Sequence, residues 1–379
     1  MRRLLLLALL LTACAPYNQV ACLPSNDALL ILDDIAAGAG ASKLKTITPQ
    51  PAKTVVPFEV AGRKNDGDLY VSGTPQAGIV LTPGASTSGK DDERLVAFAS
   101  SLARSGFAVL VPNLPNVRQL KVSPDDARVL ADAMVFLASR ADLAPGGRLG
   151  TGAFSYALGP TILAALEPDV RDKLRFVLGV GGYHDLTRVI TYFTTGYFRD
   201  APNQPWRYQK PNSYGKWAFV HSNVDRLTDE GDRTTFTEMA NRKLVDPAAT
   251  IDDLTAKLTS TEAKALLEVL NNTDPEKVPG LIKQLPAGVQ SDLAKLTLVD
   301  KDLTPLKARM ILFHGYEDDL VPYTESVSLA AAFNRRTRLF LINGFVHVDY
   351  KQPGFLDGWS FGCAIQDVLN EKWKSATDF

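Results

Sequence analysis

The chain has few of the residues that build metal sites or disulfide frameworks, since only three cysteines and four histidines occur among its 379 residues. Their positions have none of the spacings of metal ligands, so we predict no metal. Lysine and arginine form no runs and the formal net charge is −1, so we expect no nucleic-acid partner. No internal repeat or low-complexity tract is found. Beyond the N-terminus no apolar stretch approaches the roughly twenty residues that span a bilayer.

The N-terminus has the pattern of an export signal. Arg2 and Arg3 precede an apolar run, Leu4 to Leu11, and the small residues that precede Cys14. A basic start, a short apolar stretch and small residues before a cleavage site are typical of a signal peptide. The run Leu11-Thr12-Ala13-Cys14 resembles a bacterial lipobox, so we predict that residues 1–13 are removed and that Cys14 is acylated. The predicted location is the outer membrane, facing the periplasm; a plain secreted protein is the alternative.

Two further cysteines, Cys22 and Cys363, remain if Cys14 is acylated. An exported chain enters an oxidising compartment, where disulfides form and persist. We therefore predict a Cys22–Cys363 disulfide. The alternative is that Cys363 is a buried, small apolar residue.

Strands and helices are predicted to alternate along much of the chain. Val55 to Val60 and Leu69 to Ser72 indicate an antiparallel pair with a turn at 64–67. Apolar strands are then predicted at 77–82, 107–111, 148–154 and 174–180, with helices at 92–104 and 123–140 between them. This alternation indicates a mainly parallel sheet with helices on both faces.

Residues 185–305 interrupt the alternation. The segment shows helical patterns without strand character, and about 120 residues is too long for a loop in a compact domain. Its first part is rich in aromatic residues. These aromatic residues could line an apolar pocket. For most of them the favoured interpretation is that they form the core of the inserted segment.

The segment 150–159, Gly-Thr-Gly-Ala-Phe-Ser-Tyr-Ala-Leu-Gly, places Ser155 between a strand and a helix. A serine on such a tight turn projects its hydroxyl out of the backbone, where it can attack a carbonyl carbon. The positions two before and two after the serine must be small. They are Ala153 and Ala157, where glycines are usual. A serine that merely caps the helix is the alternative.

Two later segments carry the other groups that a nucleophilic serine needs, a base and an orienting carboxylate. Residues 310–322 combine a buried strand, a glycine turn, three acids and Val-Pro. The apolar run 338–343 is followed by a loop that contains His347. Serine, acid and histidine, each at a strand end and in this order, are the arrangement of α/β-hydrolases.

The chain therefore resembles the α/β-hydrolase family over roughly residues 53–184 and 306–379. The resemblance implies a mainly parallel sheet with helices on both faces and a helical cap at 185–305, while 14–52 forms a lipidated segment and linker. It implies His347 as the base and Asp318 as its carboxylate, with Asp319 a close rival and Glu317 a weaker one. His314 is interpreted as structural.

The remaining two histidines, His184 and His221, are expected to be polar surface residues or substrate contacts. The resemblance also implies an oxyanion hole formed by the backbone N–H groups of Tyr156 and Ala85. The family usually has His-Gly before this second donor, whereas this chain has Pro83-Gly84.

These features together predict a membrane-anchored serine hydrolase that cleaves carboxylic esters of small molecules or lipids without a cofactor. An amidase or peptidase would use the same three side chains. A catalytically silent envelope binding or scaffold protein on this fold is a third possibility, because Ala153, Ala157 and Pro83 depart from the family pattern. The residues do not identify protein partners.

Overall fold

The computed structural model describes residues 22–121, 123–333, 337–347, 349–350 and 355–374. Within these residues, eight strands form one sheet in the order β1-β2-β4-β3-β5-β6-β9-β10. Strand β2 is antiparallel to both of its neighbours, β1 and β4. The six strands β4, β3, β5, β6, β9 and β10 are parallel to one another. The strands are β1 Ala52–Val60, β2 Arg63–Val71, β3 Ala77–Thr82, β4 Phe107–Pro112, β5 Leu149–Phe154, β6 Phe176–Val180, β9 Arg309–Gly315 and β10 Thr337–Ile342.

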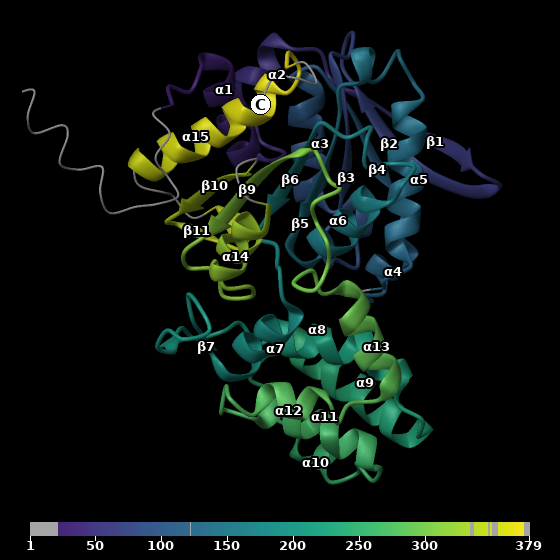
Figure 1. Ribbon diagram of the computed structural model, residues 1–379, viewed down its shortest axis with the longest axis vertical. Coiled ribbons are helices and arrows are strands. Elements are labelled where there is room, and N and C mark those ends of the chain that lie inside the picture. The colour runs from purple at the N-terminus through teal and green to yellow at the C-terminus, as the bar shows by residue number, and fades with distance from the viewer. Residues whose placement is uncertain (1–21, 122, 334–336, 348, 351–354, 375–379) are drawn as a thin grey trace, which may run out of the picture.

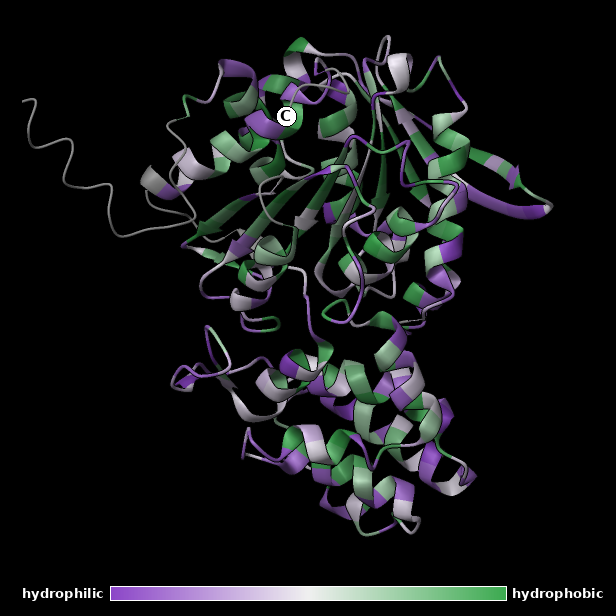
Figure 2. Cartoon of the chain, viewed as in Figure 1, coloured by the Kyte–Doolittle hydropathy of each residue, from purple (hydrophilic) through white to green (hydrophobic). Residues whose placement is uncertain are grey.

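The central strands are buried on both faces. Every residue of β3, β4 and β6 is buried, which explains their continuous apolar sequences. The predicted strand at 77–82 is confirmed with the same bounds. In Figure 2 these strands are mostly coloured as hydrophobic, whereas the β1–β2 hairpin at the edge carries hydrophilic residues.

The turn predicted at 64–67 is wrong, because these residues belong to β2. The hairpin turns instead at Ala61 and Gly62, which both have positive φ angles, 50° and 80°. This is the geometry of a tight two-residue hairpin turn. The polar run 64–67 lies within the ladder, where Asn65 pairs with Phe58 and Gly67 with Val56.

Helices cover both faces of the sheet (Figure 1). One layer contains α1 Asn26–Ala37, α3 Glu93–Arg104 and α15 Phe355–Asn370, whose apolar residues share a core with one sheet face. The other contains α5 Asp126–Ala138, α6 Leu158–Leu166 and α14 Thr324–Phe333. Two short helices, α2 Lys43–Ile47 and α4 Pro115–Arg118, lie in the connections. The predicted fold class, a mainly parallel sheet between helices, is confirmed.

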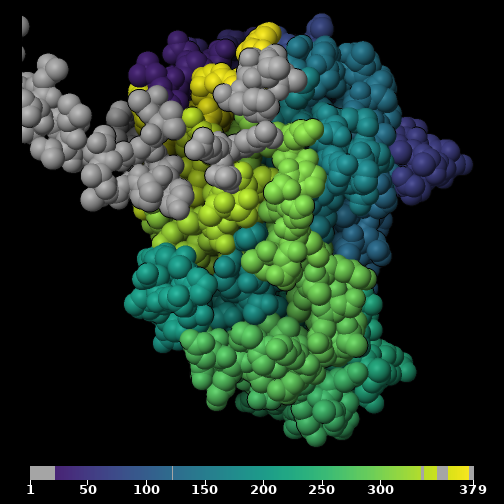
Figure 3. All heavy atoms as spheres, viewed as in Figure 1, coloured from purple at the N-terminus to yellow at the C-terminus, as the bar shows by residue number. Residues whose placement is uncertain are grey.

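The chain between β6 and β9 forms a separate helical lobe, here called the cap, below the sheet in Figures 1 and 3. It has its own hydrophobic core, which includes Phe193 and Trp217. That core also takes in Val321 and packs against Tyr156, so the cap lies against the turn that follows β5. The cap helices are α7 Leu186–Thr195, α8 Tyr214–Asn223, α9 Glu230–Val245, α10 Asp252–Thr255, α11 Thr261–Asn271, α12 Val278–Ile282 and α13 Ala287–Leu296.

The cap also contains a small hairpin that its sequence did not predict. Strands β7 Tyr197–Phe198 and β8 Arg207–Tyr208 pair antiparallel. Strands of two residues are too short to produce a periodic pattern. Tyr208 is exposed, so part of the aromatic cluster serves neither the cap core nor a pocket.

The predicted signal peptide and Cys14 lie outside the described residues. Among the helices that the structure does describe, none combines the length and the apolar character that a bilayer span requires.

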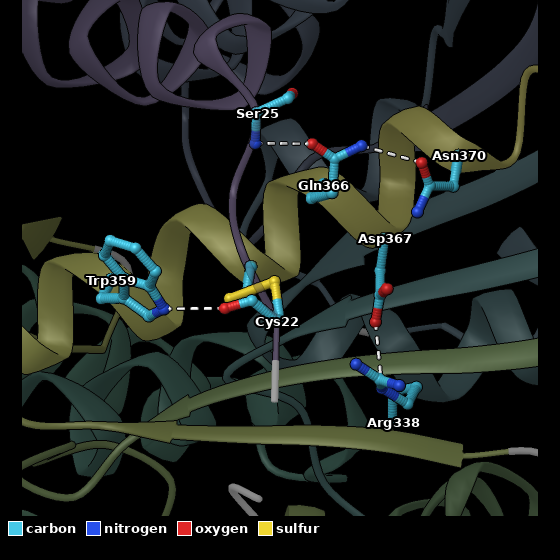
Figure 4. Close-up of a disulfide and its surroundings, with 8 residues drawn as sticks. Cys22, Ser25, Arg338, Trp359, Gln366, Asp367 and Asn370 are labelled. Carbon is cyan, nitrogen blue, oxygen red and sulfur yellow. Dashed lines mark hydrogen bonds and ion pairs between the residues drawn. A yellow bond between two sulfur atoms is a disulfide. The ribbon is translucent and has the colours of Figure 1, made fainter. Parts of the chain in front are cut away.

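A disulfide joins Cys22 to Cys363, with their Cα atoms 5.8 Å apart. It ties the segment that precedes α1 to the middle of α15 (Figure 4). Hydrogen bonds reinforce the same contact, since the Trp359 indole N–H donates to the Cys22 carbonyl (2.9 Å) and the Ser25 N–H to the Gln366 side chain (3.0 Å). The N-terminal and C-terminal helices are therefore held together at the surface of the sheet layer.

Removal of this disulfide is expected to destabilise the fold. The two cysteines are 341 residues apart, so the cross-link restricts nearly the whole unfolded chain, and its loss should cost about 2–5 kcal/mol. Thermal unfolding of Cys363→Ser should therefore occur at a lower temperature than that of the wild type. Reductant should lower the wild-type transition toward that of the variant and leave the variant unchanged; equal transitions in all four samples would contradict this expectation.

Candidate active site

The turn after β5 presents Ser155. The strand ends at Phe154, a single 3₁₀ turn covers Ser155–Ala157, and α6 begins at Leu158. Ser155 has a φ of 56°, a left-handed conformation that is uncommon for a residue with a side chain and is concentrated at functional sites. Ala153 and Ala157 are both buried, which is consistent with the need for small residues around such a turn.

Asp318 and His347 meet at the ends of the neighbouring strands β9 and β10. These strands are parallel, so the loops that follow them emerge at the same edge of the sheet. The Nδ1 atom of His347 lies 3.0 Å from Oδ2 of Asp318 and 3.2 Å from Oδ1. His347 also has a positive φ, 53°.

The Asp318 carboxylate is fully buried and multiply bonded. Its Oδ1 accepts the backbone N–H groups of Leu320 (2.9 Å) and Val321 (2.8 Å). Oδ2 lies 3.2 Å from Nε2 of His314. Burial alone would raise the pKa of Asp318, but His347 and His314 hold the pKa well below its usual range.

An ionised Asp318 fixes the proton of His347. A carboxylate can only accept hydrogen bonds, so Nδ1 of His347 carries the proton and donates it. Nε2 is then the ring atom that can accept a proton from another group. The pair therefore has the electronic arrangement of a general base with its orienting acid.

The buried His314 supports the Asp318 loop. Its Nδ1 lies 2.7 Å from the Ser326 hydroxyl, and its Nε2 lies 2.9 Å from the Val321 carbonyl. Because the neighbours of Nε2 are both acceptors, Nε2 donates and Nδ1 accepts from Ser326. This arrangement agrees with the structural role expected for His314.

Ser155 and His347 line one cavity of about 1330 Å³. Tyr156 and Ala85, the two expected oxyanion donors, line the same cavity. The loop after β3 lies beside the serine turn, since a Cβ atom on Gly84 would be 3.8 Å from that of Ser155. The sheet edge therefore gathers Ser155, His347 and the two expected oxyanion donors around one space, while Asp318 is buried behind His347.

Comparison with known proteins shows similarity in structure alone. No protein-family model and no curated protein matches the sequence. A candidate hydrolase from Legionella pneumophila aligns over 88% of this chain and 95% of its own, with a TM-score of 0.53 and 12% identity. The rice cell wall degrading esterase LipA from Xanthomonas oryzae aligns over 90% and 93%, with a TM-score of 0.52 and 12% identity.

A third match, a puromycin-hydrolyzing peptidase from Mycobacterium tuberculosis, has a TM-score of 0.45 and 13% identity over 85% of this chain, which spans 38% of the peptidase. The strand order and the first two alignments decide the fold. The chain has the α/β-hydrolase fold.

The three acids that could orient His347 have different hydrogen-bond partners in this structure. Asp318 is the acid whose carboxylate lies against the ring. The Asp319 carboxylate instead accepts from the side-chain amide of Asn212 at 3.4 Å. Burial together with the adjacent Asp318 raises the pKa of Asp319. Glu317 accepts the Gly344 N–H at 3.1 Å.

Three residues near the acid were missed by the sequence analysis. Gly181 follows β6 with a φ of +60°, and a Cβ there would lie 3.3 Å from Oδ2 of Asp318 and 3.6 Å from Nδ1 of His347. From the cap, the Tyr192 hydroxyl and the Gln209 side-chain amide each donate to the Asp318 carbonyl at 3.0 Å. The Gly181-Gly182 pair at a strand end was the one available signal; the cap contacts depend on tertiary structure.

The expectation for His184 was wrong. His184 is buried, and its Nδ1 lies 2.8 Å from the Ser328 hydroxyl of α14. Burial, with a smaller effect of Arg188, lowers the pKa of His184 to about 4. His221, by contrast, lines the cavity, where it can contact a ligand.

Proposed function

We propose that this protein is a serine hydrolase that cleaves carboxylic esters. The observation that carries the proposal is the contact between His347 and a buried, ionised Asp318 at the cavity that Ser155 also lines. The left-handed backbone of Ser155 supports its assignment as the nucleophile.

The reaction proceeds in two halves. Nε2 of His347 takes the proton of the Ser155 hydroxyl while Oγ bonds to the ester carbonyl carbon, and the imidazolium then protonates the departing alcohol as the C–O bond breaks. In the second half, His347 takes a proton from water as the water attacks the acyl-enzyme. The imidazolium then returns this proton to Oγ of Ser155 as the bond between Oγ and the acyl carbon breaks and the carboxylic acid leaves. The N–H groups of Tyr156 and Ala85 stabilise the oxyanion in both halves. No cofactor is required.

Matched substrates test the choice of ester over amide. An ester and an amide of the same acyl group should be compared, with kcat/KM measured for each. The proposal predicts turnover of the ester with at most a trace of amide cleavage. Preference for the amide would favour an amidase or peptidase, and turnover of neither by folded protein would favour a binding or scaffold protein.

We also propose that the enzyme is exported and anchored to the bacterial outer membrane through an acylated Cys14. The Cys22–Cys363 disulfide supports an oxidising compartment, and several acyl chains give stable anchoring. Incorporation of labelled palmitate by the wild type, and its loss in Cys14→Ala, would test this. Equal labelling of both would reject it.

A further inference from the structure

The lining of the cavity at the candidate site comes from two parts of the molecule. One end, here called the core arm, lies between the sheet and the helices α1, α3 and α15. Its lining includes the apolar residues Leu32, Ile35, Phe98, Leu102, Ile365 and Val368. The other end, the cap arm, is bounded by α8, α9 and α13. Its lining mixes apolar residues such as Phe219, Leu244 and Leu293 with the polar residues Tyr214, His221, Asn241 and Asp292.

Ser155 lies where the two arms meet. Phe154, immediately before it, lines the cavity and packs edge-on against Phe98 of the core arm, with ring centroids 5.4 Å apart. Tyr156, immediately after it, packs against the core of the cap. The nucleophile is thus joined to an apolar neighbour on one side and to the cap on the other.

His347 has the same relation to the core arm. Phe345, two residues before it, lines the cavity, and its ring lies 5.8 Å from that of Phe361 on α15. Ser155 and His347, the two residues that would act directly on the ester, each lie within two residues of an aromatic residue of the core arm. An acyl group bonded to Ser155 has an apolar space beside it.

The cap arm offers polar atoms that lack partners. Within the part of the chain that the structure describes, the buried Nδ1 of His221 and the buried hydroxyl of Tyr156 have no hydrogen-bond partner. Both residues line the cavity. Buried polar atoms without partners are costly and uncommon in native proteins, and a polar ligand group would satisfy them.

We infer that the substrate is an ester of a long-chain fatty acid with a polar alcohol, its acyl chain bound in the core arm and its alcohol portion in the cap arm. This inference rests on the proposed ester hydrolase activity. The cavity volume of about 1330 Å³ exceeds the roughly 300–1,000 Å³ of ordinary small-molecule sites. Each methylene transferred from water into the core arm can strengthen binding by up to about fourfold.

One substitution placed in either arm provides a matched pair. Ala97 on α3 lines the cavity beside the core arm, and Ala218 on α8 lines it in the cap; both are partly buried. Ala97→Phe and Ala218→Phe add the same ring to different arms. The acetate, octanoate and dodecanoate esters of p-nitrophenol should be compared in both variants and the wild type, with circular dichroism as a check on folding.

The wild type should prefer dodecanoate to acetate by at least about 100-fold in kcat/KM, since several methylenes are buried. This ratio should fall at least about tenfold in Ala97→Phe and stay within about threefold of wild type in Ala218→Phe. A wild type without chain-length preference, or an equal fall in both variants, would overturn the inference.

Two measurements separate failure of this inference from failure of the proposed function. A compact fluorophosphonate measures the reactivity of Ser155 whatever the chain-length preference. Calorimetry of Ser155→Ala with free dodecanoate, rather than its ester, measures binding of the acyl chain without turnover. Suppose that the wild type is labelled but shows no chain-length preference, and that Ser155→Ala does not bind dodecanoate. The hydrolase proposal would then stand, and the core arm would be rejected as the acyl site. Dodecanoate binding that is weakened in an Ala97→Phe/Ser155→Ala double variant would support the acyl site even if labelling failed.

Discussion

Replacement of Ser155 by alanine is expected to lower kcat for an activated ester by at least about 10⁴-fold, because the nucleophile is lost and the remaining groups can only assist direct attack by water. The fold should be unaffected. Alanine is smaller than serine, and the neighbouring Ala153 and Ala157 already show that this turn accepts small residues. Steady-state kinetics with a p-nitrophenyl ester, together with thermal unfolding, measures both effects.

A second serine provides the control for this prediction. Ser222, at the end of α8, lines the same cavity, but it lies on the cap rather than at a strand end. Ser222→Ala should keep kcat within about tenfold of the wild type. Wild-type turnover by Ser155→Ala would show that Ser155 is not the nucleophile. So would a loss of kcat in Ser222→Ala that exceeds the loss in Ser155→Ala.

Replacement of Asp318 by asparagine is expected to lower kcat by about 10⁴-fold, the effect known for the equivalent change in a serine protease triad. An asparagine at this position can present its N–H₂ group to His347. Nδ1 would then have to accept, and the proton would move to Nε2, where it prevents the ring from acting as a base. Oδ1 of the asparagine can still accept from Leu320 and Val321. Nε2 of His314 loses one acceptor but keeps the Val321 carbonyl, so the loop should keep its shape.

Asp319→Asn is the matched comparison, since it makes the same chemical change one residue away. Asp319 faces Asn212, and its replacement should reduce kcat by less than about tenfold. The two variants should be assayed over the same pH range with the same ester. If Asp319→Asn showed the large loss and Asp318→Asn the small one, the assignment of the orienting acid would be wrong.

The parts of the fold that were predicted correctly depend on local sequence. Strand β3 has a continuous apolar run that ends at a Pro-Gly pair, and such strands are legible because they are buried on both faces. The order of Ser155, Asp318 and His347 at strand ends was also legible. Parallel strands bring their carboxyl ends to one edge, so order along the chain implied proximity in space.

The parts that were missed depend on contacts between distant segments. The run 64–67 has the composition of a turn, but its backbone pairs with β1 and, at Gly67, with β4, and pairing overrides local preference. The buried side chain of His184 contacts Ser328, which is 144 residues away in the sequence. The core arm combines α1 with α15, so no local pattern could have indicated it.

The central claim is that Ser155 is an activated nucleophile, and covalent labelling tests it most directly. The purified protein without residues 1–13 should be treated with a fluorescent fluorophosphonate, beside its Ser155→Ala and His347→Ala variants, and the modified peptide mapped by mass spectrometry. We expect one adduct, on Ser155, that is absent from both variants. No adduct on a folded wild type, or an adduct on another serine that persists in Ser155→Ala, would contradict the claim.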